Sequence, residues 1–272
     1  KVAVAVIPPM SLGLIRFVIA TAVLYAYLVV KKQKPTLAMK DLPLMAGAGL
    51  VGVTLYFLGE NNGVLILSAS ESSIIIGTIP VLTILAERLF LRTPMSAGQY
   101  AGAALSAAGV GLMVAESLRV SARPMGYLYM GLAALSWIGY AFMTRPLFGT
   151  YSRLSITFWQ SLFGALGFVP FAFTERVDWS ALSAPVLGHV LFLGIFCSAV
   201  GYLFYITSMQ VLGTSASSVF INLVPVVSVA AAWLFLGERL SSLQMLGAAV
   251  AVLGVYLAVL AVQKPSGKSL KN

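Results

Sequence analysis

Charged residues are scarce in this sequence of 272 residues. They make up 9% of the chain, whereas 60% is hydrophobic and the mean hydropathy is +0.96. Soluble domains carry about 25% charged residues. A water-soluble fold of this length could not cover its surface with so few charges, so we expect the bilayer to be the solvent for most of the chain.

Cysteine and histidine occur once each, as Cys197 and His189. One cysteine cannot form an intramolecular disulfide, and the two residues together do not make a zinc cluster. The eight acidic residues are scattered singly, and no nucleotide-binding motif is visible. The sequence therefore predicts no metal, no cofactor and no catalytic residue, and it argues against an enzyme.

Long apolar segments are abundant. A membrane-spanning helix needs about 20 mostly apolar residues, and nine such segments are separated by short polar connections. No stretch is typical of a soluble domain. The predicted spans are 9–30, 42–67, 72–91, 97–115, 126–147, 154–173, 186–212, 215–236 and 243–262.

The second half of the chain repeats the first after 145 residues, without gaps. The stretch SSIIIGTIPVLTILAERLFL from Ser72 matches SSVFINLVPVVSVAAAWLFL from Ser217, so that Pro80 falls on Pro225. Internal duplication in a hydrophobic chain is typical of a transporter built from two halves, with its binding site where the halves meet. We assign 1–115 to the first repeat, 126–262 to the second and 263–272 to a polar cytoplasmic tail.

One predicted span of the second repeat has no counterpart in the first repeat. An offset of 144 residues places Ser155 on Ser11 and Gln160 on Arg16, so the span 126–147 matches a segment before Lys1. We expect a further helix there. The whole would then have ten helices as five plus five, of which nine are present, and an odd number per half inverts the two halves in the membrane.

The basic residues predict the orientation. The net charge is +9, and with both termini inside, eleven Lys and Arg residues lie on the inner side and five on the outer side. Such an excess on the cytoplasmic side is typical of multi-pass proteins of a bacterial-type inner membrane. The basic residues form no stripe with interleaved aromatics, so we expect no nucleic-acid partner.

Three short motifs point to a family. The segment 8–17 reads PPMSLGLIRF, 225–240 reads PVVSVAAAWLFLGERL and 134–137 reads ALSW. They resemble passages in the second, ninth and sixth helices of the drug/metabolite transporter superfamily, EamA type. The first half departs at 91–93, which reads LRT where LGE is common. The resemblance implies a ten-helix carrier of small metabolites such as amino acids, most often an exporter, and leaves the substrate open.

Arg16 is a charge inside a predicted span. It lies seven residues after Pro9, which is about 10 Å at 1.5 Å per residue. A charge at mid-membrane costs ~2.5–3.5 kcal/mol on insertion scales, so it needs a partner or water. Glu60 is at a similar predicted depth in the neighbouring span, which makes it one candidate partner. The pair is either structural or a binding and proton-coupling site.

Polar and aromatic side chains well inside the spans are the other candidates. A cavity lined by aromatic rings with hydroxyl or indole N–H groups suits an amphipathic or aromatic solute. Simple packing, or an interfacial position, is the alternative for each aromatic residue. Besides Arg16 and Glu60, the candidate substrate-binding residues are Tyr56, Asn61, Trp137, Tyr140, Trp159, Tyr202, Tyr205 and Asn222.

Pro80 and Pro225 lie near the middle of equivalent spans. Each removes an intrahelical hydrogen bond, which either kinks the helix for packing or makes a hinge for a gate. Equivalent prolines in two inverted halves favour the hinge.

The sequence thus predicts a secondary transporter that moves a small organic metabolite, an amino acid or similar solute, by alternating access between two inverted repeats. Export is the expected direction, proton coupling is one possible drive, and the protein is a monomer or a homodimer. A membrane-embedded enzyme acting on lipid and a helical scaffold that transports nothing are the alternatives.

Overall fold

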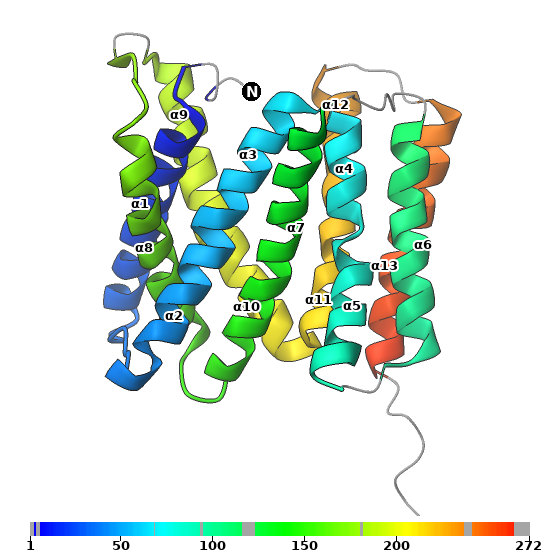
Figure 1. Ribbon diagram of the computed structural model, residues 1–272, viewed down its shortest axis with the longest axis horizontal. Coiled ribbons are helices and arrows are strands. Elements are labelled where there is room, and N and C mark those ends of the chain that lie inside the picture. The colour runs from blue at the N-terminus through cyan, green and yellow to red at the C-terminus, as the bar shows by residue number, and fades with distance from the viewer. Residues whose placement is uncertain are drawn as a thin grey trace, which may run out of the picture. The chain divides into compact units, whose positions relative to one another are not determined.

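Helices make up the fold. The computed structural model describes residues 3, 6–67, 69–92, 95–115, 123–179, 182–236 and 241–263, and none of these residues forms a β-strand. In chain order the helical segments are α1 Pro9–Val30, η1 Met39–Asp41, α2 Leu42–Gly49, η2 Leu50–Leu55, α3 Tyr56–Ile66, α4 Ala69–Gly77, α5 Ile79–Phe90, α6 Ala97–Val114, α7 Pro124–Thr144, η4 Arg145–Leu147, α8 Arg153–Ala172, α9 Ala184–Phe192, η6 Leu193–Val200, α10 Gly201–Leu212, α11 Thr214–Val219, η7 Phe220–Asn222, α12 Leu223–Leu236 and α13 Ser242–Gln263 (Figure 1).

These segments join into nine helical runs within the described residues, one for each predicted span, so the all-helical prediction is confirmed. Six of the runs are long and apolar enough to cross a membrane. Their outward faces carry large apolar side chains, such as Phe204 and Leu65, which are 68% and 62% exposed. Hydrocarbon solvates such faces, and helices satisfy their own backbone groups there. The chain is therefore a multi-pass membrane protein. The motif residues 237–240 and the tail from 264 lie outside the described residues.

The chain divides into two compact units. The first unit contains residues 1–62 and 131–210, and the second contains 63–130 and 211–272. Each unit therefore takes helices from both halves of the sequence. The compact units and the repeats read from the sequence are two different divisions of the chain.

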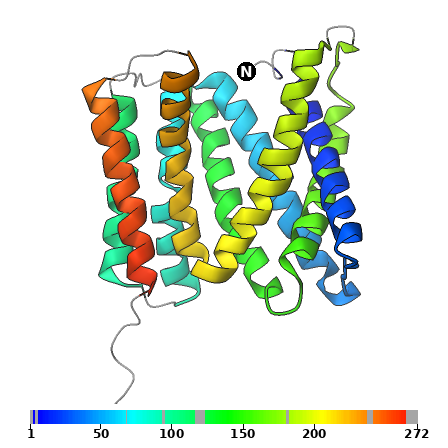
Figure 2. The same cartoon turned by 180° about the vertical axis from the view of Figure 1, so that it is seen from behind.

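In the second unit, α6 and α13 lie side by side (Figures 1 and 2). A Cβ atom on Gly102 would lie 2.7 Å from the carbonyl oxygen of Gly254, and one on Gly109 would lie 2.7 Å from that of Gly247. Gly102 matches Gly247 in the repeat, and Gly109 matches Gly254. Each contact thus has its counterpart, and the two helices run antiparallel, as an inverted repeat requires. Small residues allow this close approach.

The first unit shows the same reciprocity. A Cβ atom on Gly49 would lie 2.6 Å from the carbonyl oxygen of Gln160, and one on Gly194 would lie 3.2 Å from the carbonyl oxygen of Arg16. Gln160 matches Arg16 in the repeat. The same close contact, between a glycine and a backbone carbonyl, therefore occurs once on α8, at Gln160, and once on α1, at Arg16.

Glutamines that recur in the repeat are structural. Ser96 and Gln99 form a capping box at the start of α6, in which each side chain bonds the backbone N–H of the other residue. Ser241 and Gln244 make the same two hydrogen bonds at the start of α13. A capping box satisfies two N–H groups that the helix leaves unpaired, and this explains why Gln99 recurs as Gln244.

The close contact of α6 with α13 can be tested at Gly109. An Ala side chain there would collide with the α13 backbone, whereas a Cβ on Gly111 meets nothing within 4 Å. We expect Gly109→Ala to destabilise the protein by about 1–3 kcal/mol through overpacking. Gly111→Ala, the matched control on the same helix, should be neutral or stabilising by up to about 1 kcal/mol. Unfolding midpoints in detergent measure both, and equal midpoints would contradict the close contact.

A carboxylate caps the start of α1. Glu175, from the connection between α8 and α9, accepts hydrogen bonds from the backbone N–H groups of Met10 at 3.1 Å and Ser11 at 2.7 Å. The negative charge also complements the positive end of the helix dipole.

We expect Glu175→Ala to lower the free energy of unfolding by about 0.5–2 kcal/mol, the usual value of an N-cap. Chemical denaturation in detergent checks this. The control is Arg176→Gln, which removes an exposed charge from the same connection and should leave the midpoint unchanged.

Candidate functional site

Arg16 lies in the first unit, on α1. Its Nε donates a hydrogen bond to Ser198 Oγ at 3.3 Å, and its guanidinium carbon lies 4.8 Å from the centre of the Phe57 ring. Within the described residues, its two terminal nitrogens have no hydrogen-bond acceptor. Arg16 therefore keeps its positive charge inside a membrane span, held by one neutral oxygen and one aromatic face.

Glu60 lies nearby on α3. Its Oε1 accepts a hydrogen bond from Tyr56 OH at 3.1 Å. No ion pair joins Glu60 to Arg16 among the described residues. Each charge has instead found a closer hydroxyl, because Ser198 faces Arg16 and Tyr56 lies one turn before Glu60. The two charges still interact through space.

Five aromatic residues form what we call the aromatic cluster: Tyr56, Trp137, Tyr140, Tyr202 and Tyr205. The Trp137 ring is at the centre, with its centroid 4.7–5.9 Å from those of the four tyrosines. Its indole N–H donates to Tyr205 OH at 2.9 Å. The structure thus brings together rings from α3, α7 and α10 that are up to 149 positions apart, as from Tyr56 to Tyr205.

The aromatic cluster adjoins both charges. Tyr56 holds Glu60, and Tyr202 stacks edge-on against Phe17, the residue after Arg16, at a centroid distance of 5.5 Å. Tyr202 OH donates to the carbonyl oxygen of Gly52 at 3.0 Å.

Asn61 and Trp159 also belong to the first unit but have other contacts. Asn61 Nδ2 donates to the carbonyl oxygen of Pro9, at 3.4 Å. The Trp159 ring stacks on Phe163 and meets Phe158 edge-on, and its ring contacts do not include the aromatic cluster. Of the nine candidates in this unit, seven therefore form one connected group, and these two lie beside it.

Asn222, Pro80 and Pro225 belong to the second unit. Asn222 is buried at the end of η7, where its Nδ2 donates to Ser106 Oγ at 2.8 Å. A Cβ atom on Gly77, which matches Asn222 in the repeat, would lie 3.7 Å from Asn222 Oδ1. Two equivalent residues therefore face each other at the ends of α4 and η7.

Both prolines lie next to a change of helical geometry inside a span. Pro80 is the second residue of α5, and the single turn residue Thr78 separates α5 from α4. Pro225 is in the first turn of α12, which follows the short η7. Proline fits the first turn of a helix because that position needs no N–H donor. Each of the two equivalent spans therefore stays one helical run whose geometry changes near its proline.

Sequence reasoning missed two polar groups. Ser198 and the Gly52 carbonyl lie in apolar stretches that give no signal of a polar role. Glu87, near the end of α5, is a different case, because its position at the end of a span favours an interfacial residue. In the structure it is only 4% exposed and accepts a hydrogen bond from Ser215 of α11 in the second unit.

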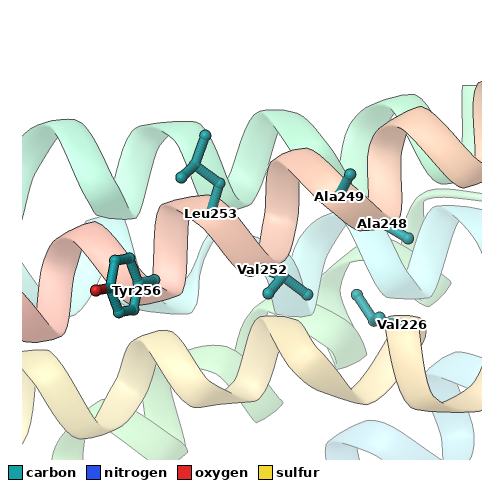
Figure 3. A pocket seen from close by; sticks show the side chains of 6 residues that line it. All are labelled: Val226, Ala248, Ala249, Val252, Leu253 and Tyr256. Atoms are coloured by element: carbon teal, nitrogen blue, oxygen red, sulfur yellow. The ribbon is translucent and has the colours of Figure 1, made fainter.

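An open groove between α12 and α13 has a different character. It measures about 540 Å³ and is lined by Val226 of α12 and by Ala248, Ala249, Val252, Leu253 and Tyr256 of α13 (Figure 3). No charged side chain lines it, and Tyr256 brings the one polar side chain of its lining, so it offers a polar solute few partners. The group around Arg16 is the better candidate site.

Known proteins resemble this chain over nearly its whole length. The model of the EamA-like transporter family matches residues 1–115 and 124–260. An uncharacterized transporter of Archaeoglobus fulgidus is 25% identical over 259 residues, which cover 95% of this chain and 91% of that protein. The uncharacterized transporter YdfC of Bacillus subtilis is 28% identical over 262 residues, 94% of this chain and 83% of that one.

One relative has a more specific name. A protein of Streptantibioticus cattleyicolor named "Probable terminal-alkyne amino-acid exporter" is 25% identical over 218 residues, which cover 80% of this chain and 73% of that protein. A solved crystal structure at 18% sequence identity has the same fold, with a TM-score of 0.82 over 95% of this chain and 91% of its own. With the family model matching both halves, the chain belongs to the EamA-like transporter family.

Proposed function

We propose that this protein is a secondary transporter that exports a small amphipathic metabolite of the amino-acid kind by alternating access. Membership of a transporter family and the multi-pass helical fold support transport. The substrate, the direction and the mechanism are the proposal.

The observation that carries the proposal is the pair of separate charges beside the aromatic cluster. Arg16 presents its terminal nitrogens without an anionic partner, and Glu60 is held by a tyrosine hydroxyl. A lone charge in a span is costly and marks a functional site by default. A solute that carries a carboxylate and an ammonium group complements both, because guanidinium binds carboxylate in a bidentate way and carboxylate binds ammonium.

The aromatic cluster supports an amphipathic solute. Ring faces bury apolar groups and also attract cations. The amino-acid exporter named among the relatives is consistent with this class of solute. A zwitterion with an apolar side chain is therefore the substrate we propose, with Asn61 and Trp159 at the edge of its site.

Alternating access is supported by the irregular helical geometry of two equivalent spans. Reciprocal contacts within each unit fit two inverted repeats, and the helical geometry of the equivalent spans changes shortly before Pro80 and Pro225. Discontinuous helices of this kind occur at the sites of inverted-repeat transporters, which open on one side at a time. We assign these prolines to the hinges, and Asn222 to the transport pathway.

The charge bias supports an inner-membrane location with both termini in the cytoplasm. We further propose that Glu60 couples transport to protons, because its carboxyl group lies close enough to Arg16 for the two charges to interact. The proposed oligomeric state is a monomer or a homodimer.

The substrate proposal can be tested with three related solutes in proteoliposomes that contain the full-length protein. L-Phenylalanine carries both charges, phenethylamine lacks the carboxylate and 3-phenylpropanoate lacks the ammonium. We expect L-phenylalanine to be transported best. Arg16→Gln, which introduces the residue that the second repeat carries at Gln160, should reduce its kcat/KM by about tenfold or more, the value of a charged hydrogen bond.

The control is Lys34→Gln, which removes an exposed charge between α1 and α2 and should leave transport unchanged. No flux of any of the three solutes, or flux that Arg16→Gln does not alter, would contradict the proposed site.

Proton coupling makes a separate prediction for Glu60→Gln. The variant keeps the shape of the side chain but cannot release a proton. We expect efflux of L-phenylalanine by the wild type to depend on the pH gradient and efflux by the variant to be independent of it. Asp178→Asn, at an exposed acidic residue, is the control. An unchanged pH dependence in Glu60→Gln removes Glu60 from this role while leaving transport itself in place.

A further inference from the structure

Two spans contain a π-helical segment at matching positions. The segment η2 separates α2 from α3, and η6 separates α9 from α10. Gly49, just before η2, and Gly194, inside η6, make the reciprocal contacts with Gln160 and Arg16 described above. π-Helices account for well under 1% of residues and are frequent at functional sites. Their presence in both repeats makes them a feature of the fold rather than a local accident.

Each π segment offers one polar group to a side chain on another helix. Ser198 of η6 accepts the hydrogen bond from Arg16 Nε of α1, at 3.3 Å. The Gly52 carbonyl of η2 accepts the hydrogen bond from Tyr202 OH of α10, at 3.0 Å. The two segments therefore hold the guanidinium and a tyrosine of the aromatic cluster.

The contacts of Arg16 fix the guanidinium in two ways. The guanidinium carbon lies over the Phe57 ring, and Ser198 occupies the Nε edge. What is left is the edge formed by the two terminal nitrogens, which offers two parallel N–H donors. A carboxylate fits that edge in a bidentate way.

Ser198 is suited to orienting the guanidinium because its side chain is neutral and small. An acidic residue in its place would neutralise Arg16 and leave little attraction for a second anion. A hydroxyl orients the guanidinium but leaves its full charge for the solute. The side chain is fully buried, with 0% exposure, so it does not compete with the solute for space.

We propose that Ser198 is a positioning residue that makes this site selective for carboxylates. It acts through Arg16 by reserving the terminal edge of the guanidinium for the carboxylate of the solute, and the π segment η6 places it there. This inference rests on the proposed function, since it concerns how the same site recognises its substrate.

The test compares Ser198→Ala with the wild type, using the same proteoliposomes with L-phenylalanine and phenethylamine. We expect the KM for L-phenylalanine to rise about fivefold to tenfold, within the range of one hydrogen bond to a charged group, with kcat unchanged. The values for phenethylamine should stay the same, because it has no carboxylate. Selectivity for the zwitterion, as a ratio of kcat/KM values, should fall by the same factor.

Two further variants separate positioning from stability. Ser198→Thr retains the hydroxyl and should restore most of the selectivity. Ser161→Ala removes another buried serine hydroxyl from the first unit, on α8, and should leave the selectivity unchanged. Unfolding midpoints in detergent report whether each variant folds.

The outcomes are distinct. No flux of either solute through the wild type overturns the proposed function, and this inference falls with it. Wild-type transport of L-phenylalanine with an unaltered Ser198→Ala overturns the inference alone. An equal loss for both solutes in Ser198→Ala, or a loss that Ser198→Thr does not restore, assigns Ser198 to structural packing and also overturns the inference.

Discussion

Hydrocarbon offers the backbone no hydrogen-bond partner, and this constraint governs the rest of the structure. Every regular helix meets it internally, so a departure from the α-helix needs a compensating group. Tyr202 OH supplies one to the Gly52 carbonyl in η2, and the Thr78 hydroxyl bonds the Ile75 carbonyl at 2.6 Å where α4 gives way to α5. The irregular backbone of the described residues thus lies next to polar side chains, and in the first unit these belong to the candidate site.

Most of the helical fold could be predicted because the bilayer sets the length of an apolar run. α1 begins and ends at the predicted residues, Pro9 and Val30, and the other runs differ by a few residues at each end. The π segments could not be predicted, since LVGVTL and LGIFCSAV are ordinary apolar sequences. Nothing in their composition indicates hydrogen bonds that span five residues, as in a π-helix, instead of four. The sequence alone therefore does not point to a role for Ser198.

Most residues of the candidate site could be predicted, but not which of them contact each other. Residue types and depth identified Arg16, Glu60 and the aromatic cluster, because polar groups inside a span need partners. Depth along a helix does not give direction around its axis, and the hydroxyls of Ser198 and Tyr56 proved closer to the two charges than the charges are to each other. The division into compact units that each contain helices of both repeats could not be predicted from the sequence either. Duplicated helices pack on their own counterparts, as α6 does on α13, so a compact unit must contain pieces of both repeats.

The equivalence of Arg16 and Gln160 has a consequence for the energetics of exchange. Both make the same backbone contact with a glycine, yet only Arg16 is charged. A carrier with two identical halves would be degenerate: its inward-open and outward-open states would have equal free energy and equal affinity. A cation in only one repeat removes that equality. In the alternating-access cycle that we propose, the inward-open and outward-open states therefore differ in free energy.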